Sequence, residues 1–454
     1  MQYDLLVTDC QLVRPDAVIH CNIGVRDGRV AALLDPGDIP AASRTIDAGG
    51  RHVVPGLIDT HVHLGNAGQS FDADCRTESR AAATGGVTTM LVYVVDRSSY
   101  DRVLPEYRAA VEAQSLVDIM FHLAIVAPEQ IPDIPRYAEE YHLWSFKAFM
   151  AYKGREVSPS GIQGLTDGQL FDFFRHVARV PGGIAVVHCE NIELIEWLQR
   201  PLMAAGRQDT AAWSDARPVF GELDAIRRAI TFAQETGARF VLPHMGIGIG
   251  SEFLREKRWG SARLWVETCP HYLVLDKDRD IGSMGKVNPP LRDRDQVAAL
   301  WDRLVDGTVD IIGSDHCPYK NADKGPDLWA ARPGITGGVA MILPVLLTDG
   351  VHAGRLPITR FVELTSAGPA RAFGLYPRKG ALEVGSDADL VILDEDVEVR
   401  VSVETLNTIS DATPYEGYLA SGWAATTIAR GQVVYDQGEI VAEPGRAQLV
   451  QRNA

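Results

Sequence analysis

Histidine and aspartate residues end several apolar segments of the chain, and imidazole and carboxylate groups are ligands for divalent metal ions. His61 and His63 stand two positions apart at the end of one such segment, and His188, His244 and Asp315 end three others. The strand period of two would put both imidazoles of the first pair on one face. A lone histidine at a strand end is more often structural. Four histidines and an aspartate on four strand ends predict a metal site.

The donor types favour zinc, and manganese, iron and cobalt also suit them. Two divalent ions about 3.5–4 Å apart need bridging anions to offset their repulsion, and these five residues supply one negative charge. Lys147, at the end of another apolar segment, is a candidate for the second anion, because carbon dioxide converts its amine to a carbamate. The alternative is an ordinary lysine whose ammonium group reaches solvent. The residues alone leave both interpretations open.

The elements that would position these side chains alternate along the middle of the chain. Eight apolar, strand-like segments end near His63, Val95, Val126, Met150, His188, His244, Thr268 and Ser314. Helical segments between them include residues 77–84, 101–114, 168–179 and 223–236. This rhythm predicts an α/β fold, a (β/α)8 TIM barrel, in which the carboxyl ends of the strands carry the chemistry. A doubly wound open sheet is the competing topology.

Short β-prone segments occupy both ends of the chain, at 4–13, 22–25 and 29–34 and again at 388–393, 424–429 and 432–435. We predict that they form one small β-sandwich domain from residues 1–52 and 380–454, with the catalytic barrel at residues 53–379.

The composition describes an ordinary soluble protein. The chain has 454 residues, 46% hydrophobic and 23% charged, with a formal net charge of -16. This acidic balance argues against a nucleic-acid partner and against an anionic membrane surface. Six dispersed cysteines without a CxxC pair indicate reduced thiols, and no apolar run reaches the roughly 18 residues of a membrane span. We therefore expect a cytoplasmic protein.

Several motifs resemble a known family. Residues 55–64, PGLIDTHVHL, are similar to the PGxIDxHxH motif of the amidohydrolase superfamily. The segments 46–50 and 385–390 are similar to parts of its composite β domain, and the later motifs resemble the cyclic amidohydrolases: hydantoinase, dihydropyrimidinase, allantoinase and dihydroorotase. The resemblance covers nearly the whole chain.

The resemblance implies a binuclear zinc site. In it His61 and His63 bind one ion, His188 and His244 bind the other, and carboxylated Lys147 bridges the two. Asp315 binds metal and shuttles protons. The family also implies a homotetramer or a homodimer, which nothing in the sequence itself tests.

Residues 146–154 are similar to the hydantoinase and dihydropyrimidinase segment whose tyrosine hydrogen-bonds the substrate, which gives that role to Tyr152. The alternative for Tyr152 is a core or rim aromatic. Gly65 stands where dihydroorotases usually carry an arginine that holds the substrate carboxylate. Asn288 replaces the serine that is more usual in hydantoinases, at a position where the family contacts the ring amide. That asparagine is closer to dihydroorotase.

The sequence therefore predicts a hydrolase that opens a small cyclic amide or imide, of hydantoin or dihydropyrimidine type, to an N-carbamoyl amino acid. A dihydroorotase-like or allantoinase-like activity is the alternative among enzymes. A non-catalytic scaffolding relative is the alternative outside them, although such relatives lose the ligands that this chain retains. We expect the loops 65–71 and 93–99 to set ring substituent and stereochemistry, and 320–338 to act as a lid or binding loop.

Overall fold

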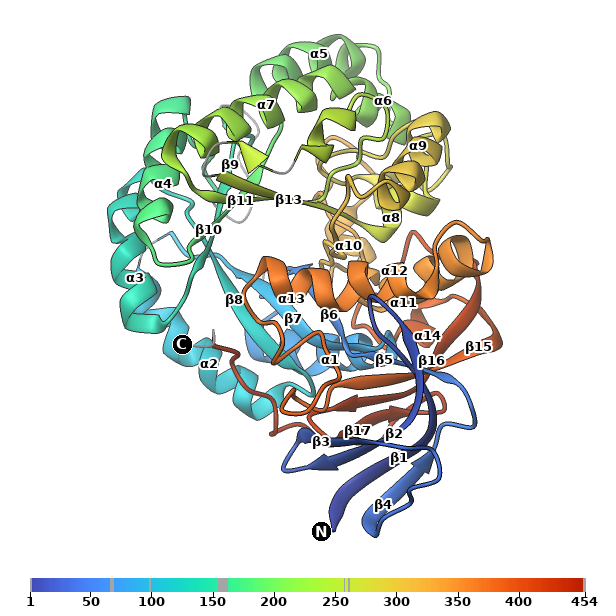
Figure 1. Cartoon of the computed structure of the whole chain (residues 1–454). Helices are drawn as coiled ribbons and strands as arrows, with labels where there is room; N and C mark the ends of the chain where they lie inside the picture. The colour runs from blue at the N-terminus through green and yellow to red at the C-terminus, as the bar shows by residue number, and fades with distance from the viewer. Residues whose placement is uncertain are drawn as a thin grey trace.

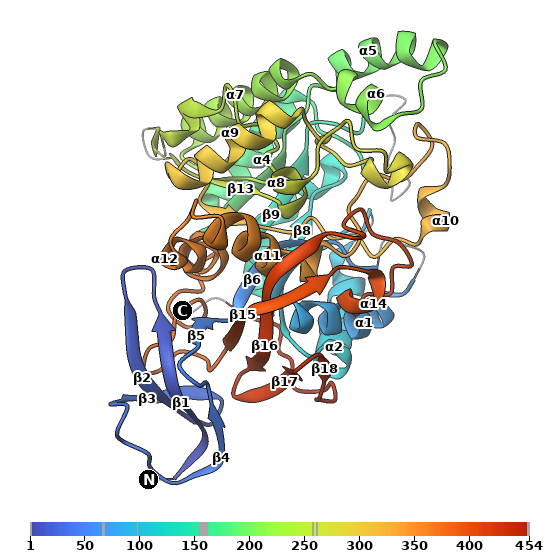
Figure 2. The same ribbon diagram turned by 90° about the vertical axis from the view of Figure 1, so that its right-hand side faces the viewer.

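The computed structural model describes residues 2–65, 69–97, 99–153, 162–256, 258–259 and 262–451. Two sheets organise this part of the chain, a ring of strands enclosed by helices and a second sheet beside it (Figures 1 and 2). The second sheet is called the small sheet below, because fewer helices surround it.

Eight parallel strands form the ring. They are β6 (Leu57–Val62), β7 (Val87–Val94), β8 (Asp118–Ala124), β9 (Ser145–Phe149), β10 (Ile184–His188), β11 (Arg239–Leu242), β13 (Ala262–Thr268) and β14 (Ile311–Ile312). Each pairs with the next in chain order, and the bridge between Val62 and His316 joins the last segment back to the first. The short β12 (Arg258–Trp259) adds to β13 as an antiparallel strand. This sequential order confirms the barrel and excludes the doubly wound sheet.

Helices cover the outside of the ring (Figure 1). The α-helices of the described residues are α1 (Phe71–Thr84), α2 (Tyr100–Gln114), α3 (Ile134–Tyr141), α4 (Asp167–Arg179), α5 (Ile192–Ala204), α6 (Thr210–Asp215), α7 (Val219–Thr236), α8 (Pro270–Val274), α9 (Arg294–Val305), α10 (Asn321–Lys324), α11 (Ile342–Val345), α12 (Ile358–Val362), α13 (Gly368–Ala372) and α14 (Val403–Leu406). In α4, the Thr166 hydroxyl accepts from Gln169 N at the first turn. Its buried face consists of Leu170, Phe173, Phe174 and Val177, because residues three or four positions apart lie on the same side of a helix.

The small sheet draws its strands from both ends of the chain. They are β1 (Tyr3–Val13), β2 (Val18–Arg26), β3 (Arg29–Leu34), β4 (Ala42–Asp47), β5 (His52–Pro55), β15 (Leu390–Arg400), β16 (Leu419–Ala429), β17 (Gln432–Asp436) and β18 (Glu439–Ile440). The antiparallel pairing of β5 with β15 joins the two groups. Apolar residues of both groups, such as Val7, Val53 and Ile428, share one buried core. This arrangement confirms the predicted second unit.

The boundaries at 52/53 and 379/380 stay a prediction. β5 pairs with β1 and β15, so the small sheet reaches Pro55, and Leu57 opens the first barrel strand.

All six cysteines are free thiols. Among the described residues, none of the helices combines the length and the apolarity needed to cross a bilayer.

Candidate active site

The six predicted metal ligands lie at the carboxyl ends of barrel strands and line one cavity of about 370 Å³. They are His61 on β6, His63 directly after it, Lys147 on β9, His188 at the end of β10, His244 shortly after β11 and Asp315 shortly after β14. All but His63 are almost fully buried. The structure thus brings together residues that are spread over more than half of the chain.

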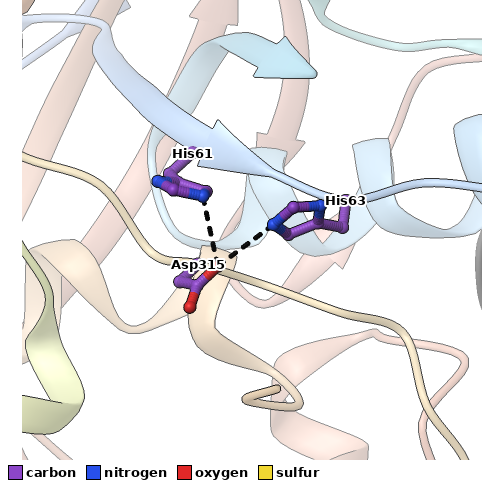
Figure 3. Close-up of side chains that lie close together, drawn as sticks. All are labelled: His61, His63 and Asp315. Atoms are coloured by element: carbon purple, nitrogen blue, oxygen red, sulfur yellow. Dashed lines mark hydrogen bonds and ion pairs between the residues drawn. The ribbon is translucent and has the colours of Figure 1, made fainter. Parts of the chain in front are cut away.

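One group of ligands consists of His61, His63 and Asp315 (Figure 3). Asp315 Oδ1 lies 3.3 Å from His61 Nε2 and 3.2 Å from His63 Nε2. One ligand atom from each residue lies within 4.8 Å of the others. Two imidazole nitrogens and a carboxylate oxygen that converge in this way fit one divalent ion.

The second group consists of His188, His244 and Lys147. His188 Nδ1 lies 3.1 Å from His244 Nε2, and Lys147 Nζ lies 3.5 Å from the same nitrogen. The rings of His61 and His244 are 5.1 Å apart between centroids. The two groups are therefore neighbours, as two ions that share ligands require.

Three of the predicted site residues have left-handed backbone conformations. The φ angles of Tyr152, His244 and Asp315 are 59°, 41° and 53°. Residues other than glycine seldom adopt this region, which costs free energy and is concentrated at functional sites. In this barrel, it turns the chain sharply where strands end and side chains enter the cavity.

Glu267 is a site residue that the sequence analysis did not single out. It is fully buried, and its Oε1 lies 2.8 Å from His61 Nδ1 and accepts the backbone N–H of His244 at 3.0 Å. The Thr60 hydroxyl donates to Oε2. A proton held on His61 Nδ1 leaves Nε2 as the metal-binding atom. The feature of the sequence that could have identified Glu267 is its position beside Thr268, at the end of the seventh predicted strand.

Glu190 has the same relation to the second group. Its Oε2 lies 2.7 Å from His188 Nε2, which leaves His188 Nδ1 facing His244. Each group therefore contains a histidine whose second nitrogen is held by a buried carboxylate, an arrangement typical of metal ligands.

Burial sets the protonation of these groups. It lowers the pKa of His61 and of His244 well below the usual histidine value, and the charge of Lys147 lowers both further. Both rings are therefore neutral, the form that binds metal. Burial also lowers the pKa of Lys147, although the negative charges of Asp315 and Glu267 act in the opposite direction.

Tyr152 and Asn288, the predicted substrate residues, lie on the cavity wall. Asn288 Nδ2 donates to the Tyr152 hydroxyl oxygen at 3.3 Å. The Tyr152 ring lies 5.5 Å from the His188 ring between centroids. The phenol is therefore next to the second ligand group, whereas a core aromatic would be away from it.

The rest of the wall comes partly from segments that the sequence did not mark. Trp213 and Lys286 line the cavity, and so do Arg200 and Met203 of α5. Residues 329–334, within the predicted binding loop 320–338, form another part of the wall. In the loops 65–71 and 93–99, residues 66–68 and 98 lie outside the described residues, and Val95 lines the cavity.

Comparison with known proteins places the chain in a family. The model of the Amidohydrolase family matches residues 52–434. The L-hydantoinase of Paenarthrobacter aurescens is 36% identical over 464 residues, which cover 99% of this chain and 98% of that protein. The allantoinase of Solibacter usitatus (strain Ellin6076) is 34% identical and covers 97% of this chain and 96% of its own length.

Comparison with solved structures leads to the same family. The L-hydantoinase (dihydropyrimidinase) from Arthrobacter aurescens superimposes with a TM-score of 0.91 at 36% identity, over 99% of this chain and 100% of that one. The likeness extends over both the barrel and the small sheet, so this chain belongs to the amidohydrolase family and is a cyclic amidohydrolase.

Proposed function

We propose that this enzyme opens the ring of small cyclic amides or imides of the hydantoin or dihydropyrimidine type and releases an N-carbamoyl amino acid. The observation that carries the proposal is the gathering of six ligand-type side chains and Tyr152 in one cavity of about 370 Å³. In the reaction a ring C–N bond breaks. The carbonyl carbon gains a hydroxyl from water and the ring nitrogen gains a proton.

The donor set fits two divalent ions, which we propose to be zinc. His61 and His63 would hold one ion, His188 and His244 the other, and Asp315 would complete the first group. Two bound ions lower the pKa of a water molecule toward about 7 and polarise the carbonyl group of the substrate.

We propose that Lys147, as its carbon dioxide-derived carbamate, would hold both ions and supply the second anion of the site. Lys147 is 1% exposed, which argues against an ammonium group that reaches solvent. Within the described part of the chain, its Nζ makes no ion pair with a carboxylate, and its polar neighbour is His244 Nε2. A carbamate supplies the missing negative charge at this position and uses the surrounding imidazoles as partners.

Two side chains would assist the reaction directly. Asp315 would accept the proton of the attacking water and return it to the leaving ring nitrogen. Its position beside both His61 and His63 supports this role. The Tyr152 hydroxyl donates a hydrogen bond to the oxyanion that develops on the carbonyl oxygen.

The test compares hydantoin, dihydrouracil, allantoin and dihydroorotate as substrates for the zinc-loaded chain and for its Asp315→Asn variant. We expect turnover of hydantoin or dihydrouracil, and a fall in kcat of roughly 10²–10⁴-fold in the variant, as for a lost proton carrier. Circular dichroism and metal content serve as controls of fold and loading. A loaded chain that opens none of the four rings contradicts the proposal.

The same panel decides between the alternatives. The full-length likeness to an allantoinase makes allantoin the second candidate, and turnover of allantoin alone would assign that activity. Gly65, in the place of the dihydroorotase arginine, disfavours dihydroorotate. The proposed homotetramer or homodimer is measured by light scattering on the same samples.

A further inference from the structure

A chain of hydrogen bonds runs along the cavity wall from Trp213 through Asn288 to Tyr152. Trp213 Nε1 donates to Asn288 Oδ1 at 3.1 Å and to Val287 O at 3.1 Å. Asn288 Nδ2 then donates to the Tyr152 hydroxyl oxygen at 3.3 Å. Trp213 and Asn288 are 3% and 6% exposed, so little water competes for these bonds.

The indole fixes the direction of this chain. An indole N–H donates and never accepts, so the amide atom of Asn288 that faces it has to be the carbonyl oxygen. The other amide atom, which faces Tyr152, is then the NH2 group. The Tyr152 oxygen consequently acts as an acceptor toward Asn288, and its own O–H has to donate to an acceptor other than Asn288.

The Trp213 ring is itself held in place by two cations. The guanidinium carbon of Arg217 lies 3.4 Å from the ring centroid, and Lys286 Nζ lies 4.0 Å from it. Both separations are within the range of cation–π attraction. Lys286 Nζ also donates to Trp329 O at 2.9 Å. The indole N–H is therefore fixed by its ring contacts as well as by its acceptors.

We propose that Trp213 is a positioning residue for ring opening, an inference that rests on the function proposed above. By holding the Asn288 carbonyl oxygen, Trp213 keeps the NH2 group toward Tyr152 and the Tyr152 proton toward the substrate oxyanion. Without the indole N–H, the Asn288 amide can turn over. Its carbonyl oxygen would then accept the Tyr152 proton and withdraw it from the reaction.

The test is a double-mutant cycle with Trp213→Phe and Tyr152→Phe, assayed on the ring that the wild-type chain opens fastest. Tyr152→Phe removes one oxyanion donor, so we expect kcat to fall roughly 10²–10³-fold. We expect Trp213→Phe to lower kcat by about tenfold, with KM changed much less, because the donor is misdirected in only part of the molecules. In the Tyr152→Phe background, Trp213→Phe should have no further effect.

The matched control is Trp301→Phe. Trp301 is a buried tryptophan of α9 whose Nε1 donates to Leu273 O at 3.1 Å, away from the cavity lining. This variant also loses one buried indole N–H, and we expect it to keep the wild-type kcat. Metal content is measured for every variant, and equal loading separates an effect on Tyr152 from a loss of metal.

A second variant keeps the proposal falsifiable if Trp213→Phe does not fold. In Asn288→Asp the carboxylate accepts from both Trp213 and Tyr152, so the variant should match Tyr152→Phe in kcat although Trp213 is intact. The role of Trp213 is overturned if Trp213→Phe lowers kcat equally in the wild-type chain and in the Tyr152→Phe variant. A fully active Asn288→Asp variant overturns it as well. A metal-loaded wild-type chain that opens no ring overturns the proposed function instead.

Discussion

Carboxylates fix two of the three buried histidines of the candidate site through their second ring nitrogens, Glu267 for His61 and Glu190 for His188. The convergence of the six proposed ligands in one cavity could be predicted, because each stands at or near the end of an apolar segment and the barrel brings such ends together. The carboxylates that hold these histidines could not be predicted. His61 and Glu267 stand 206 positions apart, and which imidazole a strand-end carboxylate meets depends on how the barrel closes.

Lys147→Ala tests the carbamate at the residue scale. We expect the metal content to fall from two ions per chain to one or none, because the variant lacks the bridging anion. The measurement is elemental analysis after chelation and reloading with zinc. Wild-type chain reloaded in buffer free of carbon dioxide should recover less metal than chain reloaded with bicarbonate.

Lys277→Ala is the matched control, since Lys277 pairs with Asp215 and Asp293 and does not line the cavity. It should keep both ions. Two ions per chain in Lys147→Ala would refute the bridge.

At the scale of elements, the strand ends agreed with the sequence more closely than the helix starts did. The apolar segments end within two residues of the observed ends of the barrel strands, and at β6, β10, β11 and β14 a histidine or aspartate stands close to that end. Helix α1 begins at Phe71, ahead of the predicted residue 77, because its first turns mix acidic and apolar residues without a clear helical period. The left-handed backbone conformations of Tyr152, His244 and Asp315 were not predicted either. They follow from packing at the barrel mouth.

Glu267→Gln tests how neighbouring strand ends are tied together. Glu267 on β13 contacts Thr60 and His61 on β6 and the backbone of His244 after β11. The amide of glutamine has a single acceptor atom for three donors, so His61 loses its fixed orientation. We expect zinc affinity to fall roughly 10–100-fold, measured by competition with a chelator. Unchanged affinity with an unchanged fold would show that Glu267 does not orient the ligand.

At the scale of the molecule, the barrel and the small sheet are joined by a buried charged cluster. Lys379 Nζ donates to Asp118 on β8 and to Asp389 before β15, both at 2.6 Å, and lies 3.1 Å from Asp387. Burial opposes the lysine charge, and the three carboxylates outweigh it and raise the Lys379 pKa. The sequence predicted the two units and their origin. The cluster could not be predicted from the sequence, because Asp118 stands 261 positions from Lys379 and becomes its neighbour only when the barrel and the small sheet are both formed.

Lys379→Met should destabilise the chain by about 3–5 kcal/mol, because it leaves buried carboxylates without a compensating charge. Denaturant unfolding measures the change. Arg108→Met is the comparison, since Arg108 and Glu112 form an exposed ion pair that contributes about 0–1 kcal/mol. Equal losses in the two variants would show that the cluster adds nothing beyond a surface pair.

The pairing of β5 with β15 also has a consequence for biosynthesis. Pro55 meets Leu390 across that junction, so roughly 330 residues leave the ribosome between the two partners, about 20–70 s of translation at ordinary rates. During that interval one edge of β5 has no strand beside it, and an open edge invites pairing with other nascent chains. The small sheet is completed only when the last part of the polypeptide emerges, after the barrel strands have already been made.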